Sequence, residues 1–155
     1  MNTETIKELL PQGSFSHSCI VVSNIDEVYQ QYAKIPGAEL TPLKQTNEPA
    51  VAKVVYRGES TPTVARQFFV TMGGLRTEVL EPDGHPNVWA EILKRQGGSS
   101  LHHMGFDVKD AQPVVEFFAS QGMGVLQTGN YIGGRYTYID TLDALGMVIE
   151  LLETV

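Results

Sequence analysis

The stretch His102-His103-Met104-Gly105-Phe106-Asp107-Val108-Lys109-Asp110 has a counterpart early in the chain, Ser16-His17-Ser18-Cys19-Ile20-Val21-Val22-Ser23-Asn24. In this comparison His17 and His103 are in register and stand 86 positions apart. Each stretch predicts a histidine on a short strand that leads into a helix, because Asn24 and Asp110 are residues favoured at a helix N-cap. The chain is therefore expected to contain two similar halves.

The same order of elements is predicted after each of these strands. A helix with apolar residues at helical spacing ends near a glycine, two short strands follow, and a last strand carries an acidic residue, Glu78 or Glu150. The two short strands are predicted at residues 38–43 and 51–56 in the first half, and at 124–127 and 136–140 in the second. We therefore expect an α+β fold in which two βαβββ modules form paired curved sheets around a metal-binding cleft.

The modules are expected to form a single domain over residues 1–155. The first module covers about 14–83, a linker helix about 86–96, and the second module about 99–155.

Composition and charge limit the class of protein. A chain of 155 residues with 42% hydrophobic residues can bury a sizeable core. Its net charge of -7 would repel nucleic acid, and no apolar run approaches the roughly 20 residues of a membrane span. Residues 1–10 match neither a secretion signal nor a transit peptide. We therefore expect a cytoplasmic protein that binds a small molecule rather than nucleic acid or a membrane.

Histidine and glutamate are the residues that could carry chemistry. The single cysteine, Cys19, excludes an internal disulfide and a multi-thiolate zinc site, so metal ligands are expected to be nitrogen and oxygen. One histidine on a strand is more often a core or surface residue than a ligand, but two at matching positions of a repeat are unusual. Glu150 lies in an apolar strand that is predicted to be buried, where an unpaired carboxylate is costly. Repetition and burial together favour a metal site.

These residues resemble the vicinal oxygen chelate superfamily, which contains glyoxalase, methylmalonyl-CoA epimerase, extradiol dioxygenases and the bleomycin-resistance and fosfomycin-resistance proteins. The resemblance runs from about residue 14 to residue 155. It is most specific at residues 101–108 and 146–151, which are most similar to the epimerase branch. The resemblance implies a homodimer and one divalent metal ion, for which two imidazoles and two carboxylates suit Zn²⁺, Co²⁺, Ni²⁺ or Mn²⁺. The implied ligands are His17, Glu78, His103 and Glu150.

His102 competes with His103 for the third ligand position. We choose His103 because only His103 repeats the step to valine that runs from His17 to Val22. Neighbouring residues of a strand point to opposite faces. His102 is therefore expected to have a structural or outer-shell role.

The activity implied by the resemblance is that of a metal-dependent isomerase or lyase of the epimerase or glyoxalase type. A metal ion that polarises a carbonyl lowers the cost of removing the adjacent α-proton and stabilises the resulting enolate. The expected substrate is a small carbonyl compound, such as a CoA or thiol conjugate. Glu150 is the expected catalytic base, and a role as a fixed ligand stays open. The alternatives are a metal-free protein that sequesters an antibiotic, of the bleomycin-resistance type, and a metal-dependent transferase that acts on an antibiotic.

Three further residues are expected to contact the substrate. Lys53, in the strand predicted at 51–56, takes the place of a second acidic base of the epimerases. It could act as a base with a lowered pKa, hold a substrate anion, or simply be solvated. Arg135 follows a pair of glycines and could orient an anionic substrate. Tyr138 is expected on the cleft wall, where aromatic residues are more often part of the core.

Overall fold

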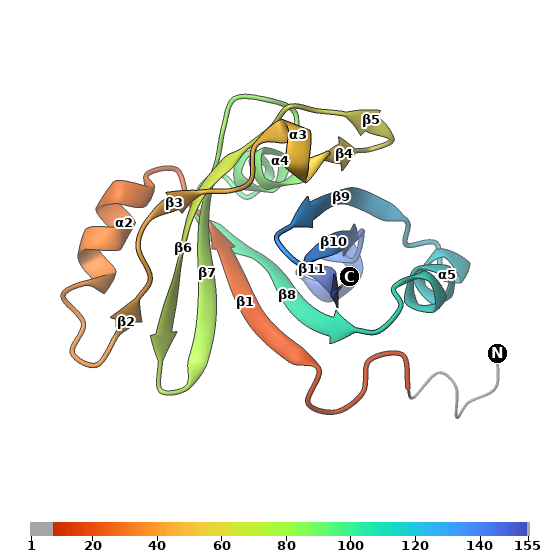
Figure 1. Cartoon of the computed structure of the whole chain (residues 1–155), viewed down its shortest axis with the longest axis horizontal. Coiled ribbons are helices and arrows are strands. Elements are labelled where there is room, and N and C mark those ends of the chain that lie inside the picture. Colours follow the sequence, from red (N-terminus) through yellow and green to blue (C-terminus); the bar gives the residue numbers. More distant parts are fainter. Residues whose placement is uncertain (1–7, 155) are drawn as a thin grey trace.

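A computed structural model describes residues 8–154 of the chain. Residues 1–7, which make up most of the N-terminal stretch considered above, and residue 155 lie outside the described part. Two similar halves stand on either side of a central pair of strands, as Figure 1 shows. Within residues 8–154, no helix combines the length and the hydrophobicity that a membrane span requires.

The first module begins with the predicted strand and helix and ends with the predicted acidic strand. Asn24 caps its helix by accepting a hydrogen bond from the Glu27 backbone N–H, as its position in the sequence predicts. The elements of this module are β1 (Phe15–Val21), α2 (Ile25–Tyr32), β2 (Glu39–Leu40), β3 (Lys44–Gln45), α3 (Pro49–Ala52), β4 (Val55–Tyr56), β5 (Glu59–Ser60), β6 (Ala65–Met72) and β7 (Leu75–Pro82).

The linker helix and the second module follow the predicted order more closely. Asn87 caps the linker helix through its side-chain oxygen, which accepts from the Ala90 N–H. The elements are α4 (Val88–Arg95), β8 (Ser100–Val108), α5 (Gln112–Ser120), β9 (Val125–Tyr131), β10 (Gly134–Ile139), a short α6 (Leu142–Leu145) and β11 (Val148–Thr154).

The two modules share one sheet. Its eleven strands include the run β6-β7-β1-β8-β11-β10-β9, in which β1 and β8 are antiparallel neighbours. In each half the first strand pairs in parallel with the last strand, β1 with β7 and β8 with β11. The predicted α+β class with two curved half-sheets is confirmed, and the pairing of β1 with β8 joins the halves edge to edge.

The prediction of a strand at residues 51–56 is wrong. Pro49 starts the short helix α3 there, and Lys53 ends it in a left-handed conformation with φ 45°. Only the two residues of β4 are extended, and they pair with β9 of the second module. The third strand of the first module is β6, in which Ala65, Phe68 and Val70 are buried. The strand predicted at 38–43 shortens to β2, since Pro42 interrupts it.

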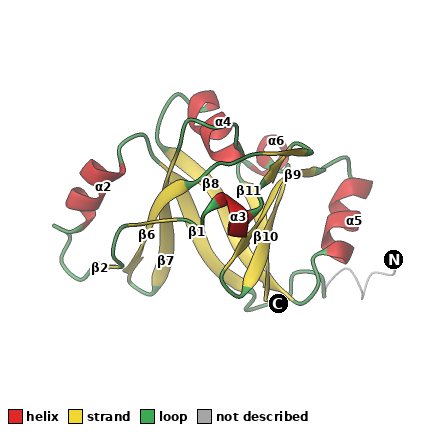
Figure 2. Cartoon of the chain, turned by 45° about the horizontal axis from the view of Figure 1, so that its top comes forward, coloured by secondary structure: helices red, strands yellow, loops and turns green. Residues whose placement is uncertain are grey.

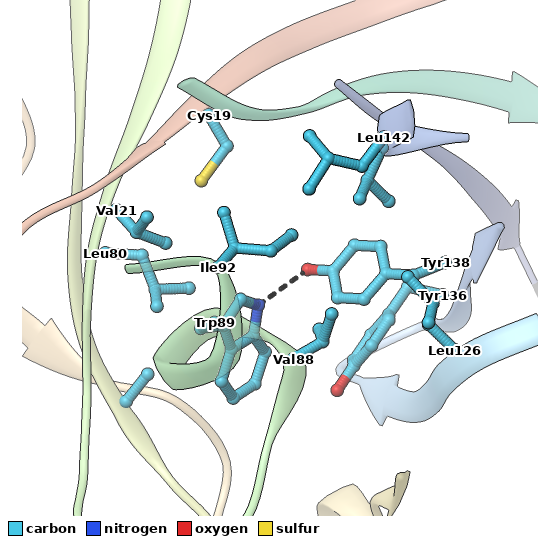
Figure 3. Close-up of a cluster of buried hydrophobic side chains, with 12 residues drawn as sticks. Cys19, Val21, Leu80, Val88, Trp89, Ile92, Leu126, Tyr136, Tyr138 and Leu142 are labelled. Carbon is cyan, nitrogen blue, oxygen red and sulfur yellow. Dashed lines mark hydrogen bonds between the residues drawn. The ribbon is translucent and has the colours of Figure 1, made fainter. Parts of the chain in front are cut away.

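Helices cover the outer face of each half-sheet, and α4 covers the inner side (Figure 2). Helix α2 packs on Phe68 and Val79 of the first module, whereas α5 packs on Ile149 and Leu151 of the second. Helix α4 contributes Trp89 to a third cluster that lies between the modules (Figure 3). Alternate residues of the central strands therefore face either a covering helix or the space between the two halves.

Candidate functional site

Four adjacent strands, β7, β1, β8 and β11, carry the predicted ligands in two rows. In one row Cys19 of β1 lies opposite Glu78 on one side and His103 on the other. The next row has His17 and Glu150, with Gly105 between them. Each row therefore holds one histidine and one glutamate with a small residue in the middle, and the two rows are related by the sequence repeat.

The four side chains end at nearly the same point. His17 Nε2 lies 3.3 Å from His103 Nε2, 3.6 Å from Glu78 Oε2 and 3.3 Å from Glu150 Oε2. His103 Nε2 lies 3.6 Å from Glu78 Oε2 and 3.1 Å from Glu150 Oε2. All four residues are buried, with at most 7% of any one of them exposed.

These separations fit a divalent ion. For bonds of about 2.0 to 2.2 Å, tetrahedral ligand atoms stand about 3.3 to 3.6 Å apart and neighbouring octahedral ones about 2.8 to 3.1 Å. Glu150 Oε2 is buried and has no hydrogen-bond partner in the described part of the chain. Such a carboxylate oxygen is costly unless a cation meets it, so the donor set and its unmet charge both suit a metal ion.

Gly105 leaves the space that the ligands need. A Cβ atom built on Gly105 would lie 2.7 Å from Glu150 Oε2 and 2.9 Å from His17 Cε1. Both distances are shorter than ordinary van der Waals contacts. The glycine is therefore required by the close approach of two candidate ligands rather than by its backbone conformation.

The pKa values of the four groups are shifted by burial and by one another. Burial raises the pKa of Glu150 to about 8, although His17 opposes the shift, and burial lowers the pKa of His103 to about 3. For His17, burial acts to lower the pKa, but the carboxylates of Glu78 and Glu150 outweigh it and the pKa is raised. For Glu78, burial acts to raise the pKa, but the imidazoles of His17 and His103 outweigh it and the pKa is lowered. The site thus favours an ionised Glu78 and a neutral His103.

His102 lies behind His103. Its Nδ1 is 2.8 Å from His103 Nδ1, and it is fully buried. The strand makes room for both rings by a register shift: Cys19 pairs with His103 and Ile20 with Leu101, so His102 is the extra residue of a bulge. The contact between the rings holds His103 with Nε2 toward the other ligands. Sequence reasoning predicted the outer-shell position, and the bulge is how two neighbouring residues come to lie together.

Three of the candidate ligands, His17, Glu78 and Glu150, line a cleft of about 400 Å³ between the modules. Its wall contains aromatic side chains, and Trp89 Nε1 donates a hydrogen bond of 3.1 Å to the hydroxyl of Tyr138, drawn as the dashed line in Figure 3. Tyr138 lies opposite Glu150 on the neighbouring strand. Tyr138 thus lines the cleft, and its contact with a substrate stays a prediction.

Lys53 and Arg135 do not line this cleft, contrary to our expectation. Both line a separate hollow of about 340 Å³, and Arg135 forms a salt bridge of 2.6 Å with Glu153 there. Arg135 is an odd number of residues away from Tyr136 and Tyr138 on the same strand, so it points to the opposite face. Lys53 is excluded because its segment caps a helix instead of extending the first half-sheet.

The cationic side chains of the cleft are ones that sequence reasoning missed. Lys44 of β3 and Arg76 of β7 both line it, and neither forms a salt bridge within residues 8–154. Arg76 stands two residues before Glu78, on the same side of β7, and its guanidinium lies 4.0 Å from the centre of the Phe69 ring. Because side chains alternate between the two faces of a strand, the position of Arg76 two residues before Glu78 could have predicted that it faces the cleft. The position of Lys44 could not be predicted in this way, since it is set by the path of the short strand β3.

Comparison with known proteins agrees with this architecture. The sequence profile of the Glyoxalase/Bleomycin resistance protein/Dioxygenase superfamily matches residues 16–139. The chain belongs to this superfamily. The matched residues include three of the four candidate ligands of this superfamily member, and Glu150 lies beyond them.

Several relatives of this superfamily member are epimerases by name. The ethylmalonyl-CoA/methylmalonyl-CoA epimerase of Cereibacter sphaeroides is 22% identical over 143 residues, which cover 90% of this chain and 96% of that protein. The crystal structure of methylmalonyl-CoA epimerase from Mycobacterium tuberculosis superimposes with a TM-score of 0.63 at 18% identity, covering 97% of this chain and 95% of the other. A methylmalonyl-CoA epimerase in complex with methylmalonyl-CoA and NH4⁺ gives a TM-score of 0.56 at 18% identity, covering 92% and 94%. At these identities the structures establish a shared fold.

Proposed function

We propose that this protein is a divalent-metal-dependent isomerase or lyase that moves an α-proton next to a carbonyl, as an epimerase or a glyoxalase does. The observation that carries the proposal is that the two imidazole nitrogens lie within 3.1 to 3.6 Å of each other and of both carboxylate oxygens, in a buried site that opens to a cleft. His17, Glu78, His103 and Glu150 would hold the ion, whose Lewis acidity would polarise the carbonyl and stabilise an enolate.

Glu150 is the group of this chain that we assign to proton transfer. Its Oε2 atom is buried and has no hydrogen-bond partner among residues 8–154, and Tyr138 lies opposite it on the neighbouring strand. A carboxylate held close to the substrate can accept the α-proton and return it. Asp107 is the other acidic residue among the described cleft residues besides Glu78, and it is exposed. With Lys53 outside the cleft, we propose that one buried carboxylate serves both proton-transfer steps.

The substrate class follows from the charges of the cleft. Lys44 and Arg76 line the cleft and form no salt bridge with any residue that the structure describes, so a carboxylate or phosphate of the substrate could pair with them. Epimerase relatives act, by their names, on malonyl-type CoA thioesters. We therefore propose that the substrate is a thioester that also carries a carboxylate, or a related thiol conjugate.

Metal content and proton exchange test the proposal together. Protein purified without a histidine tag is expected to contain about one equivalent of divalent metal per chain, and the His103→Ala variant should lose it. In deuterated water the loaded protein is expected to wash deuterium into the α-carbon of α-carboxylated thioesters, and less into thioesters that lack the carboxylate. A folded protein that takes up no Zn²⁺, Co²⁺, Ni²⁺ or Mn²⁺ would instead be a binding protein of the sequestering class.

His102 is proposed to fix the tautomer of His103. When His103 binds an ion through Nε2, its proton is on Nδ1 and can be donated to His102 Nδ1, 2.8 Å away. The His102→Phe variant is expected to bind metal about 10- to 100-fold more weakly, as removal of such second-sphere hydrogen bonds does. Calorimetric titration of folded protein measures this, with His85→Phe as a control because His85 is exposed and bonds to Asp83. Equal affinities in the two variants would limit His102 to packing.

The homodimer implied by the resemblance stays a prediction. Light scattering during gel filtration gives the mass directly, and a single species near 17.0 kDa would contradict it.

A further inference from the structure

Cys19 occupies the position in the first module that Gly105 occupies in the second. Each stands two residues after the histidine of its module. Cys19 lies between Glu78 and His103 on the neighbouring strands, just as Gly105 lies between His17 and Glu150. The row that contains Glu78 and His103 therefore has a thiol between its two candidate ligands, whereas the row that contains His17 and Glu150 has no side chain at that position.

The thiol belongs to a second set of donors. The potential ligand atoms of Cys19, Glu78 and His103 all lie within 4.8 Å of one another, and all three residues are buried. In the described part of the chain, the hydrogen bond found for the sulfur is one of 3.6 Å to the Ile20 carbonyl, which is a weak contact. Figure 3 shows the sulfur on the inner side of the sheet, facing the cluster that contains Ile92. The sulfur is thus held beside two candidate ligands, Glu78 and His103.

A second observation points to a cation in the same space. Glu150 Oε2 is buried, has no hydrogen-bond partner and lies 3.1 Å from His103 Nε2. His103 belongs both to the donor set with Glu150 and to the donor set with Cys19. An ion bound to His103 could therefore shift between an oxygen-rich set of ligands and one that contains sulfur.

We propose that Cys19 is an additional ligand for thiophilic ions, so that Cd²⁺, Co²⁺ or Zn²⁺ is held with sulfur, whereas Mn²⁺ uses only nitrogen and oxygen. The reason is that thiolate is a soft ligand, which Mn²⁺ disfavours. On coordination the S–H bond breaks, the proton leaves to the solvent, and the sulfur lone pair binds the ion. This inference rests on the metal site of the proposed function and adds a preference for soft metals to it.

Metal titrations of the full chain without a tag test the inference. In the Cys19→Ala variant the Kd for Cd²⁺ is expected to rise about 10-fold or more, while the Kd for Mn²⁺ stays the same. The Co²⁺-loaded wild type is expected to show a sulfur-to-cobalt charge-transfer band in the near ultraviolet, and the variant should lack it. Cys19→Ser, which keeps the shape of the side chain but replaces the soft sulfur by a hard oxygen, replaces Cys19→Ala if the latter does not fold.

The outcomes separate this inference from the proposed function. Unchanged Cd²⁺ affinity and no charge-transfer band in the wild type would overturn the role of Cys19, even if His103→Ala still abolished binding of every metal. If the folded wild type bound neither Cd²⁺ nor Mn²⁺, the metal site and the inference would both be wrong.

Discussion

Replacement of Glu150 by glutamine is expected to slow α-proton exchange by at least about 100-fold, because positioned acid–base groups contribute about 10²- to 10⁴-fold to such reactions. The substitution keeps the shape of the side chain and removes its charge and its basicity. Since Glu150 Oε2 is buried without a hydrogen-bond partner, loss of the charge should not lower the free energy of unfolding. The variant is therefore expected to lose catalytic rate and metal affinity but not stability.

The measurement is deuterium exchange at a metal concentration that saturates the variant. A variant that binds metal and fails to exchange would assign Glu150 to proton transfer, whereas a variant that no longer binds metal would assign it mainly to the ligand set. Glu153→Gln is the matched control. Glu153 lies on the same strand and is equally buried, but its carboxylate contacts Arg135 and the Ala111 N–H, away from the cleft. Full activity in Glu150→Gln would refute both roles.

Addition of one methyl group at Gly105 is expected to weaken metal binding more than about 100-fold. The new Cβ would meet Glu150 Oε2 at 2.7 Å and His17 Cε1 at 2.9 Å, so at least one of these candidate ligands must move. Overpacking of this kind also costs about 1–3 kcal/mol of stability. The effect on metal affinity is expected to exceed that of a lost outer contact, because a group that touches the ion is itself displaced.

Calorimetric titration of Gly105→Ala with Zn²⁺ or Co²⁺, together with thermal unfolding, measures both effects. Gly124→Ala is the control, because a Cβ at Gly124 has no atom within 4 Å and the residue is not in a left-handed conformation. The control should keep both metal affinity and stability. Tight metal binding by Gly105→Ala would mean that the ion is not held between His17 and Glu150.

The repeat explains why the site is built on so few strands. Parallel pairing of the first and last strand of each module sets a glutamate beside the strand that carries a histidine. Antiparallel pairing of β1 with β8 then brings the two modules together, so that His17 and His103 meet. Neither module holds all four groups. The site therefore depends on the joining of the two half-sheets.

Sequence reasoning succeeded where the two halves of the chain carry matching residues. The repeat identified β8 as the strand of His103 and β11 as the strand of Glu150, and the second module was predicted in the right order. It failed at residues 51–56, where the repeated order of elements suggested a strand but Pro49 and the left-handed Lys53 form a helical turn. Arg135 was misplaced because its face on β10 was not counted against that of Tyr138.

The sequence by itself determined that the chain is a duplicated βαβββ protein and which histidines and glutamates are equivalent in its two halves, because periodicity and repetition are local properties. Only the tertiary structure decided that those four side chains converge, that Gly105 leaves room for them, and that Lys44 and Arg76 rather than Lys53 and Arg135 line the cleft. The reason is that these relations depend on strand register and on the pairing of β1 with β8. Side chains that lie 3.3 Å apart in space belong to residues 86 positions apart in the chain, and no local pattern specifies such a distance.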